Sequence, residues 1–239
     1  MKNIVLINSK IETSPSRFTY AQKRSIYSSE ERFEQTKNTI LSIKKYIPNC
    51  HIILIDNSVL EKYMHCYFEN EVDLFINPID DLVLNHDTNI NPTKAVGELA
   101  HIKCALEYID NLDFEWGNLY KICGRYILNP SFNYQYFNND KNIFRRNHAL
   151  TDFKQREINQ KALYDSMVCF FTSFYKISRR NYDQFKSAII NSYYLFKSDR
   201  RYANEPIELV LCNMINDKVE VKAIGVTINC AVESWIEDI

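Results

Sequence analysis

Residues Leu119–Leu128 read LYKICGRYIL and lie near the middle of this chain of 239 amino acids. Apolar residues alternate there with polar or small ones, which is typical of a β-strand with one buried face. Gly124 interrupts the alternation, and a glycine inside a strand often marks a bend or the close approach of another molecule. Lys121 and Arg125 flank the glycine, and an arginine fork beside a lysine charge suits an anion such as a phosphate. The stretch therefore predicts either an anion-binding strand or an ordinary edge strand with solvated cations.

Two apolar runs nearer the N-terminus, Ile4–Ile7 and Ile52–Ile55, are typical of strands that are buried on both faces of a parallel sheet. A helix is expected between them, because apolar residues recur at helical spacing after Ser29, a residue type that often caps a helix. Pro48 ends that periodic segment. Residues 4–56 therefore predict one β-α-β unit with two parallel strands.

The rest of the chain predicts further helices and strands. Helices are expected at 60–68, 94–109, 182–196 and 206–215, and strands at 72–76, 167–175 and 219–224. Residues 79–93 are expected to be irregular, and residues 133–165 are aromatic and charged. No internal repeat, low-complexity linker or break in composition divides the chain. We therefore expect residues 1–239 to form a single α/β domain with a mostly parallel central sheet flanked by helices.

Composition argues against several classes of protein. A net charge of -1 is unlike that of a dedicated nucleic-acid binder, which carries a basic excess. No apolar run approaches the ~20 residues that a membrane span needs, and no signal peptide is expected at the N-terminus. The seven cysteines show no metal-ligand spacing, which favours reduced, buried thiols in a cytoplasmic protein.

Polar residues follow the first two predicted strands, at the edge where ligands bind in open α/β sheets. Asn8, Ser9 and Lys10 come after the first strand, and Asp56 and Asn57 come after the second. A carboxylate such as Asp56 accepts hydrogen bonds from a ribose or a base, although a role in a turn or cap is the alternative.

A long polar segment follows the first strand and contains Arg24. Long loops at strand ends are often functional, and a plain surface loop is the alternative. The glycine motifs of common nucleotide-binding folds, G-x-G-x-x-G and G-x-x-x-x-G-K-[ST], are absent, and so is the G-x-S-x-G of α/β-hydrolases. A phosphate site in this protein would therefore depend on side-chain cations.

The β-α-β opening, whose second strand ends in the IDNS of Ile55–Ser58, resembles the nucleotide-binding half of GT-A-type glycosyltransferases. The YKICGRY of Tyr120–Tyr126 is similar to the K-[IL]-[ST]-G-R-Y signature of small bacterial and large-virus sugar transferases. The resemblance covers most of residues 1–128 and thins beyond them. It implies a GT-A-like, Rossmann-like domain in which residues 1–128 bind a nucleotide-sugar and residues 129–239 form the acceptor-side half.

The resemblance implies transfer of a sugar from a nucleotide-sugar donor to a glycan or a lipid-linked acceptor, in polysaccharide or glycoconjugate biosynthesis. No nucleic-acid partner and no transmembrane segment are expected, while peripheral contact with a membrane would suit a lipid-linked acceptor. The expected donor-binding residues are Asn8, Ser9, Lys10, Arg24, Asp56, Asn57, Lys94, Lys121, Gly124, Arg125 and Tyr126. Further phosphate contacts are expected from Arg145, Arg146 and His148, for which a solvated basic turn is the alternative.

One departure from the family concerns metal. Many GT-A enzymes carry an Asp-x-Asp pair at the end of the central strand, where it binds a divalent metal on the donor diphosphate. Lys121 and Arg125 hold that position here, and cations neutralise a leaving diphosphate as a metal does. We therefore expect transfer without a required cofactor, with dependence on Mn or Mg as the less favoured alternative.

Inverting sugar transfer also needs a base that takes the proton of the acceptor hydroxyl. Glu208 is the first candidate and Glu205 the second, because both lie where a late helix opens and GT-A enzymes often place an acid there. The alternative is that acids in a first helical turn only favour the helix dipole. Two other functions stay open: a nucleotidyltransferase, which would need acidic metal ligands at the strand ends, and a non-catalytic module that binds nucleotides or glycans.

Overall fold

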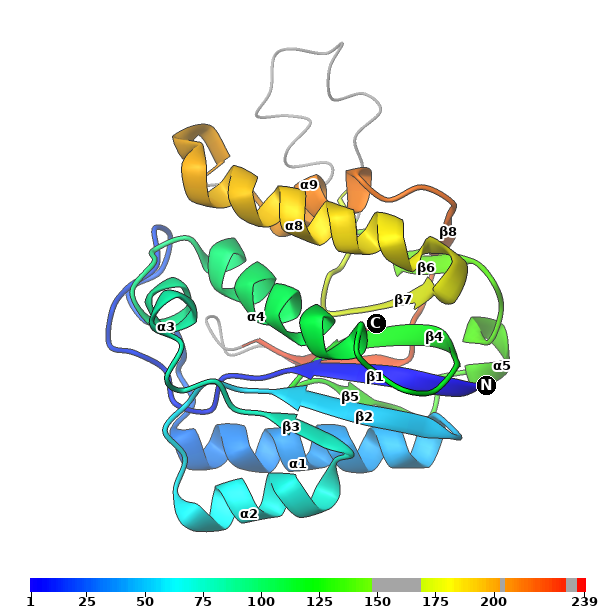
Figure 1. Cartoon of the computed structure of the whole chain (residues 1–239), viewed down its shortest axis with the longest axis horizontal. Coiled ribbons are helices and arrows are strands. Elements are labelled where there is room, and N and C mark those ends of the chain that lie inside the picture. The colour runs from blue at the N-terminus through cyan, green and yellow to red at the C-terminus, as the bar shows by residue number, and fades with distance from the viewer. Residues whose placement is uncertain (148–168, 203–204, 231–235) are drawn as a thin grey trace.

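The computed structural model describes residues 1–147, 169–202, 205–230 and 236–239. A seven-stranded sheet lies at its centre, with the strand order β3-β2-β1-β4-β7-β6-β8 (Figure 1). The pairs β1–β2, β1–β4, β2–β3 and β6–β8 are parallel, and β7 is antiparallel to both β4 and β6. The strands are β1 Lys2–Asn8, β2 Cys50–Ile55, β3 Leu74–Ile76, β4 Trp116–Cys123, β6 Asn142–Arg145, β7 Phe174–Ser178 and β8 Lys218–Val221.

Helices cover both faces of the central sheet (Figure 1). One face carries α3 Leu82–Asn89, α4 Lys94–Ile109, α8 Tyr182–Ser198 and α9 Ile207–Asn213. The other face carries α1 Ser29–Tyr46, α2 Lys62–Glu71, the short α5 Tyr134–Phe137, and a smaller sheet of β5 Ile127–Leu128, β9 Val226–Asn229 and β10 Ile236–Asp238. This is the mixed α/β class with a mostly parallel central sheet that the sequence predicts.

The first strand shows why the core has two sides. Ile4 and Leu6 pack with the cluster under α4 and α8, whereas Val5 and Ile7 pack with the cluster over α1 and α2. None of the four has exposed surface. A continuous apolar run predicts such burial on both faces. The β-α-β prediction is confirmed, because β1 and β2 are parallel neighbours joined through α1.

The cap of α1 lies one residue earlier than expected. Ser28, not Ser29, is the N-cap, and its hydroxyl accepts a hydrogen bond of 3.2 Å from the Glu31 amide. The Glu31 carboxylate accepts one of 2.8 Å from the Ser28 amide in return. This capping box satisfies two amides that the helix itself leaves without a partner. It thereby fixes the start of a helix whose Arg32 and Thr36 reach the carboxyl edge of the sheet.

The predicted central strand is in fact two strands. β4 ends at Cys123, the chain turns at Gly124 and Arg125, and β5 then joins the smaller sheet. A Cβ added at Gly124 would lie 2.9 Å from the Ser9 Cβ and 3.1 Å from the Thr36 Oγ1. Gly124 therefore marks a bend, as expected, but what approaches it closely is the chain itself. The structure gives this glycine a packing role.

Two expectations about local structure are wrong, the one for residues 79–93 and the one for the strand at 167–175. Residues 79–93 are not irregular, because the Asp81 side chain accepts hydrogen bonds from two amides of the first turn and so caps α3. Residues 133–165 include α5 and β6. The strand expected at 167–175 is shifted along the chain to β7. Within the described ranges, no helix is both long enough and apolar enough to cross a bilayer.

Candidate functional site

A pocket lies where β1 and β4 end and α4 begins, which is the carboxyl edge of the parallel strands. Much of the predicted donor site lines it, together with one of the two predicted acids: Asn8, Ser9, Lys10, Arg24, Lys94, Arg125, Tyr126 and Glu208. The pocket also takes in residues that the sequence analysis did not name as site residues, among them Arg32, Glu98, His101, Cys123, Thr172 and Cys230.

Lys94 is the first residue of α4 and is exposed at the pocket. Within the part of the chain that the structure describes, its ammonium makes no hydrogen bond. Partial desolvation lowers the pKa of Lys94, but the neighbouring Tyr20, Tyr126, Glu98 and Glu208 together raise it above the usual value. The side chain is therefore a full positive charge whose three N–H donors are available to a ligand.

Arg125 stands in the turn after β4 and lines the same pocket. Its Nε donates a long hydrogen bond of 3.5 Å to the Asn229 carbonyl, and the Asn229 amide donates back to the Arg125 carbonyl at 3.1 Å. The guanidinium lies 5.7 Å from the centre of the Tyr126 ring, a cation–π distance. The outer N–H groups of Arg125 have no partner among the described residues, so this guanidinium is held in place and still has donors to offer.

Lys121 lies on β4 but does not reach the pocket. The strand turns its side chain toward α4, and it has no exposed surface. Its ammonium donates to Glu98 Oε1 at 2.5 Å, to the Thr172 carbonyl at 2.7 Å and to Cys123 Sγ at 3.2 Å. All three donors are therefore used within the fold, and the structure does not bring Lys121, a predicted donor-binding residue, to the lining of the pocket.

Glu98, the partner of Lys121, lies on α4 one turn after Lys94 and does line the pocket. Burial alone would raise the pKa of this carboxyl. The charges of Lys121 and Lys94 outweigh burial and hold the pKa below its usual value. The ion pair with Lys121 thus favours the charged form of the Glu98 carboxylate.

Glu208 lies in the first turn of α9 and is the second carboxylate of the pocket. Burial and the nearby Glu98 raise its pKa, although Lys94 acts in the opposite direction. The hydroxyl of Thr172 is 3.4 Å from Glu208 Oε1. Glu205, the second predicted acid, does not line the pocket. Geometry therefore favours Glu208 over Glu205 as the group that meets a substrate.

Asp56 has the alternative role that the sequence analysis kept open. Its two carboxylate oxygens accept hydrogen bonds of 2.8 Å from the Ile11 and Ser58 amides, and the residue has no exposed surface. It does not line the pocket. Asn57 is also buried and lies below the pocket, where its amide oxygen accepts a hydrogen bond of 3.1 Å from Lys10 Nζ. These two residues hold the loops after β1 and β2 together through hydrogen bonds within the chain.

A buried histidine joins the two strand ends. His101 Nδ1 is 2.8 Å from Asn8 Oδ1, and His101 Nε2 is 2.8 Å from Asn57 Oδ1. Burial lowers the pKa of His101 to about 4, so the ring is neutral at pH 7 and has one donor and one acceptor. Lys10 already donates to Asn57 Oδ1, so Nε2 is the donor and Nδ1 the acceptor. A hydrogen bond to Nδ1 then requires the Asn8 amide to be rotated by 180°, which exchanges its NH2 group with the Oδ1 that lies 2.8 Å from the ring.

Arg24 fastens the polar segment between β1 and α1 to the loop before α4. Its guanidinium donates to the carbonyls of Ser16 at 3.0 Å, Thr88 at 2.9 Å and Asn91 at 2.5 Å. The side chain is buried, and burial lowers its pKa. Arg24 lines the pocket, as predicted, but its donors are used by the backbone.

The second group of predicted phosphate contacts lies elsewhere. Arg145 Nε donates to the Lys222 carbonyl at 3.0 Å, and its guanidinium is 4.7 Å from the centre of the Phe171 ring. Arg146 forms a single β-bridge with Phe170. Neither arginine lines the pocket, and His148 lies outside the described residues.

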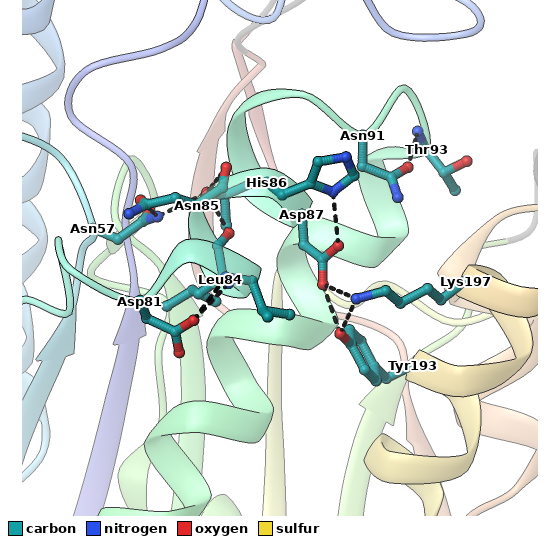
Figure 2. Close-up of polar contacts among 12 residues, drawn as sticks. Asn57, Asp81, Leu84, Asn85, His86, Asp87, Asn91, Thr93, Tyr193 and Lys197 are labelled. Atoms are coloured by element: carbon teal, nitrogen blue, oxygen red, sulfur yellow. Dashed lines mark hydrogen bonds and ion pairs between the residues drawn. The ribbon is translucent and has the colours of Figure 1, made fainter.

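Figure 2 shows how α3 is held between the β2 loop and α8. Asp87 is buried and accepts hydrogen bonds from the Tyr193 hydroxyl at 2.6 Å and from Lys197 Nζ at 2.8 Å, both on α8. On its other side, α3 presents Asn85, whose amide oxygen accepts a hydrogen bond of 2.7 Å from Asn57. This network fixes α8 and the β2 loop relative to the helix that adjoins the pocket.

The described residues contain no group of three or more His, Cys, Asp or Glu side chains that could hold a metal ion. The acids nearest to β4 in sequence lie at its other end, where Asp110 accepts a hydrogen bond of 2.9 Å from the Tyr182 hydroxyl. The cationic side chains that line the pocket are Lys10, Arg24, Arg32, Lys94 and Arg125, and the carboxylates are Glu98 and Glu208.

Comparison by sequence finds nothing similar: no family model matches the chain, and no curated protein matches it. Comparison by structure finds glycosyltransferases. The galactosyltransferase LgtC, in complex with donor and acceptor sugar analogues, has a TM-score of 0.50 and 8% identity, over 92% of this chain and 73% of that one. At this identity the likeness establishes the fold alone, and it confirms the GT-A-like architecture that the resemblance implied.

Two further solved structures are also similar to this chain. Core-mannan synthase A (CmsA/Ktr4) of Aspergillus fumigatus, in its Mn/GDP form, has a TM-score of 0.49 and 7% identity over 95% of this chain and 74% of that one. The glycosyltransferase GlyE of Streptococcus pneumoniae TIGR4 has a TM-score of 0.47 and 11% identity. The match covers 93% of this chain and 45% of GlyE, so this chain spans less than half of that protein.

Proposed function

We propose that this protein is a glycosyltransferase that moves a sugar from a nucleotide-sugar donor to a hydroxyl of a glycan or a lipid-linked acceptor, in polysaccharide or glycoconjugate biosynthesis. One observation carries the proposal: two cations with unused donors, Lys94 and Arg125, share a pocket with Glu208, a carboxylate of raised pKa. The pocket lies at the edge of the sheet where α/β folds bind ligands. The fold, which LgtC shares, supports the same function.

Each of the charged side chains Lys94, Arg125 and Glu208 has one role in the proposed reaction. The acceptor oxygen forms a bond to the anomeric carbon while the bond from that carbon to the phosphate oxygen breaks. The electron pair leaves with the nucleoside diphosphate, and Lys94 and Arg125 stabilise the added negative charge. The hydroxyl proton goes to Glu208, whose raised pKa brings it nearer to the operating pH, where a general base is most effective. Residues that line the same pocket are proposed to complete the donor site: Asn8, Ser9, Lys10 and Tyr126.

We further propose that the reaction needs no divalent metal, because the cations supply the neutralisation that a metal would give to the leaving group. Initial rates measured with EDTA, and then with added Mn²⁺ or Mg²⁺, test this point. Equal rates support it. A rate that vanishes with EDTA and returns with one metal contradicts it without contradicting sugar transfer.

The test of the function combines binding with turnover. A panel of nucleoside diphosphates is screened by thermal shift, since a ligand that binds only the folded state raises its melting temperature. The matching nucleotide-sugars are then assayed for release of the diphosphate. We expect one base to give both signals. We expect Arg125→Ala to weaken diphosphate binding by roughly 10- to 100-fold, which is about 1.5–3 kcal/mol for hydrogen bonds to a charged group.

Arg180→Ala is the matched control, because Arg180 is exposed and its ion pairs with Asp140 and Asp217 are outside the pocket. Full activity in a folded Arg125→Ala variant would contradict the proposed site. Release of pyrophosphate from nucleoside triphosphates would indicate a nucleotidyltransferase. Binding without turnover would indicate a binding module.

The cytoplasm is the proposed compartment. All seven cysteines are free thiols, and free thiols persist in reducing compartments. A lipid-linked acceptor would bring the protein to a membrane surface. Co-sedimentation with vesicles that contain the acceptor lipid tests that contact, and recovery of all the protein in the supernatant would favour a glycan in solution.

A further inference from the structure

A short turn of the segment between β1 and α1 is seated beside the start of α4. The Phe18 amide donates to the Ala21 carbonyl at 3.0 Å, which closes the turn. The Thr19 amide donates to the Pro92 carbonyl, also at 3.0 Å. Pro92 is two residues before Lys94, so the turn lies next to the open cation of the pocket.

Two aromatic rings of this turn are stacked on a fixed arginine. The Arg24 guanidinium lies 4.3 Å from the centre of the Phe18 ring. The rings of Phe18 and Tyr20 have centres 5.7 Å apart and an angle of 9° between their planes. Phe18 lines the pocket and is buried. Tyr20 is 61% exposed, so the stack presents one accessible aromatic ring on a support that is anchored to the backbone.

That ring is close to the reacting groups of the proposed transfer. Phe18, on which the Tyr20 ring is stacked, lines the pocket together with Lys94 and Glu208, and Tyr20 lies beside that lining without being part of it. An acceptor that gives its proton to Glu208 must lie against this carboxylate. Tyr20 is an exposed aromatic ring beside the pocket, whose lining includes the cations Lys94 and Arg125. A molecule that contacts both the Tyr20 ring and the charged pocket must have an apolar face and hydroxyl groups at its edge.

We propose that Tyr20 is the acceptor platform of this enzyme and that the reacting end of the acceptor is a sugar. The C–H face of the sugar ring lies on the phenol ring, and one of its hydroxyls is directed toward Glu208. This assignment rests on the proposed function and narrows it, because it selects a glycan or a glycolipid headgroup over an acceptor whose reacting hydroxyl belongs to a lipid or a protein side chain.

The experiment separates acceptor binding from donor binding. Initial rates are measured with both substrates varied, and hydrolysis of the donor by water is measured without an acceptor. Tyr20→Ala is expected to raise the KM for a sugar acceptor by roughly 3- to 10-fold, the range of an aromatic contact of about 0.5–1.5 kcal/mol. The KM for the donor and the rate of donor hydrolysis are expected to stay unchanged. Tyr20→Phe keeps the ring and is expected to behave like the unmodified protein.

Tyr108→Ala is the matched control, because Tyr108 is 44% exposed at the far end of α4. An unchanged acceptor KM in Tyr20→Ala overturns the inference. A rise in the donor KM alone overturns it too, and would assign the ring to the nucleobase. If the unmodified protein turns over no nucleotide-sugar, the proposed function fails. Saturation-transfer NMR with free monosaccharides then decides about Tyr20 independently: binding that Tyr20→Ala loses supports the platform, and equal signals or none contradict it.

Discussion

Two lysines lie near Glu98, and the structure gives them opposite surroundings. Lys121, on the central strand, is fully buried and donates to Glu98, Thr172 and Cys123. Lys94, at the start of α4, is exposed and has no hydrogen-bond partner among the described residues. Both side chains carry the same charge beside the same carboxylate. Of the two, only Lys94 therefore has donors that the described part of the fold leaves available to a ligand.

The energetic roles of the two lysines should differ in the same way. Removing one partner of a buried ion pair costs about 3–5 kcal/mol, because the other charge stays buried without compensation. Removing a surface charge that has no partner usually changes stability by about 0.5 kcal/mol or less. Lys121 should therefore matter for folding and Lys94 for binding, and the two kinds of measurement can be made on the same pair of variants.

The largest expected effect concerns Glu208, a carboxylate that lines the pocket with Lys94. Glu208→Gln removes the proposed base and is expected to lower the transfer rate by about 10²- to 10⁴-fold, the usual contribution of general base catalysis. Because the base must be deprotonated, the rate of the unmodified protein should rise with pH through the raised pKa of Glu208. That limb of the pH–rate profile should vanish in Glu208→Gln.

Glu205→Gln serves as the matched control for this measurement, since Glu205 lies three residues away and does not line the pocket. It should keep the rate and the pH profile of the unmodified protein. The reverse result, with activity lost in Glu205→Gln and kept in Glu208→Gln, would move the base to the other acid.

The next effect tests the comparison of the lysines directly. Lys121→Met should lower the free energy of unfolding by about 3–5 kcal/mol, measured by urea denaturation. Lys94→Met should stay within about 0.5 kcal/mol but should lose affinity for the nucleoside diphosphate. Adding Glu98→Gln to Lys121→Met should restore part of the stability, because it removes the unpaired charge. Equal destabilisation by Lys94→Met and Lys121→Met would contradict the different roles proposed for the two lysines.

The smallest expected effect concerns the buried histidine under the pocket. Burial lowers the pKa of His101 from 6.5 to about 4 in the folded protein. Between these values the unfolded chain binds the proton and the folded one does not, so stability is full above pH 6.5 and falls as the pH is lowered toward 4. From pH 6.5 to pH 5 the loss should be about 2 kcal/mol.

His101→Gln carries no titrating group and should flatten this part of the stability profile. Urea denaturation at pH 5, 6 and 7 on both proteins is the measurement. If the two profiles keep the same slope, another group causes the acid sensitivity and the ring is not held neutral.

Much of the site could be predicted from local sequence, and the reasons for the failures are specific. Lys94, Arg125 and Glu208 were predicted from their places at helix starts and after the central strand, together with the resemblance to GT-A enzymes, and the structure brings all three to the pocket. The sequence analysis did not name His101 as a site residue, although its spacing along the helix could have indicated it. Glu98 and His101 follow Lys94 by four and seven residues, a spacing that places all three on one face of the expected helix.

Three of the predicted donor-binding residues have polar groups that the fold already uses, and the reason is the same for all three. Asp56 has a carboxylate, and Arg24 and Lys121 have cations, but backbone groups or side chains far away in the sequence take up their hydrogen bonds. No pattern within a window of a few residues reports on such partners. The Phe18–Tyr20 stack was overlooked for a related reason, because its support, Arg24, is itself fixed by contacts to the loop before α4.

The sequence by itself determined the β-α-β opening, the class of fold and the placement of charged residues at strand and helix ends. These depend on the period of apolar residues, which is a local property. Only the tertiary structure decided which charges remain available to a ligand. A hydrogen-bond donor serves a ligand when no other part of the chain has taken it, and which parts meet at the carboxyl edge of the sheet is settled by the packing of the whole fold.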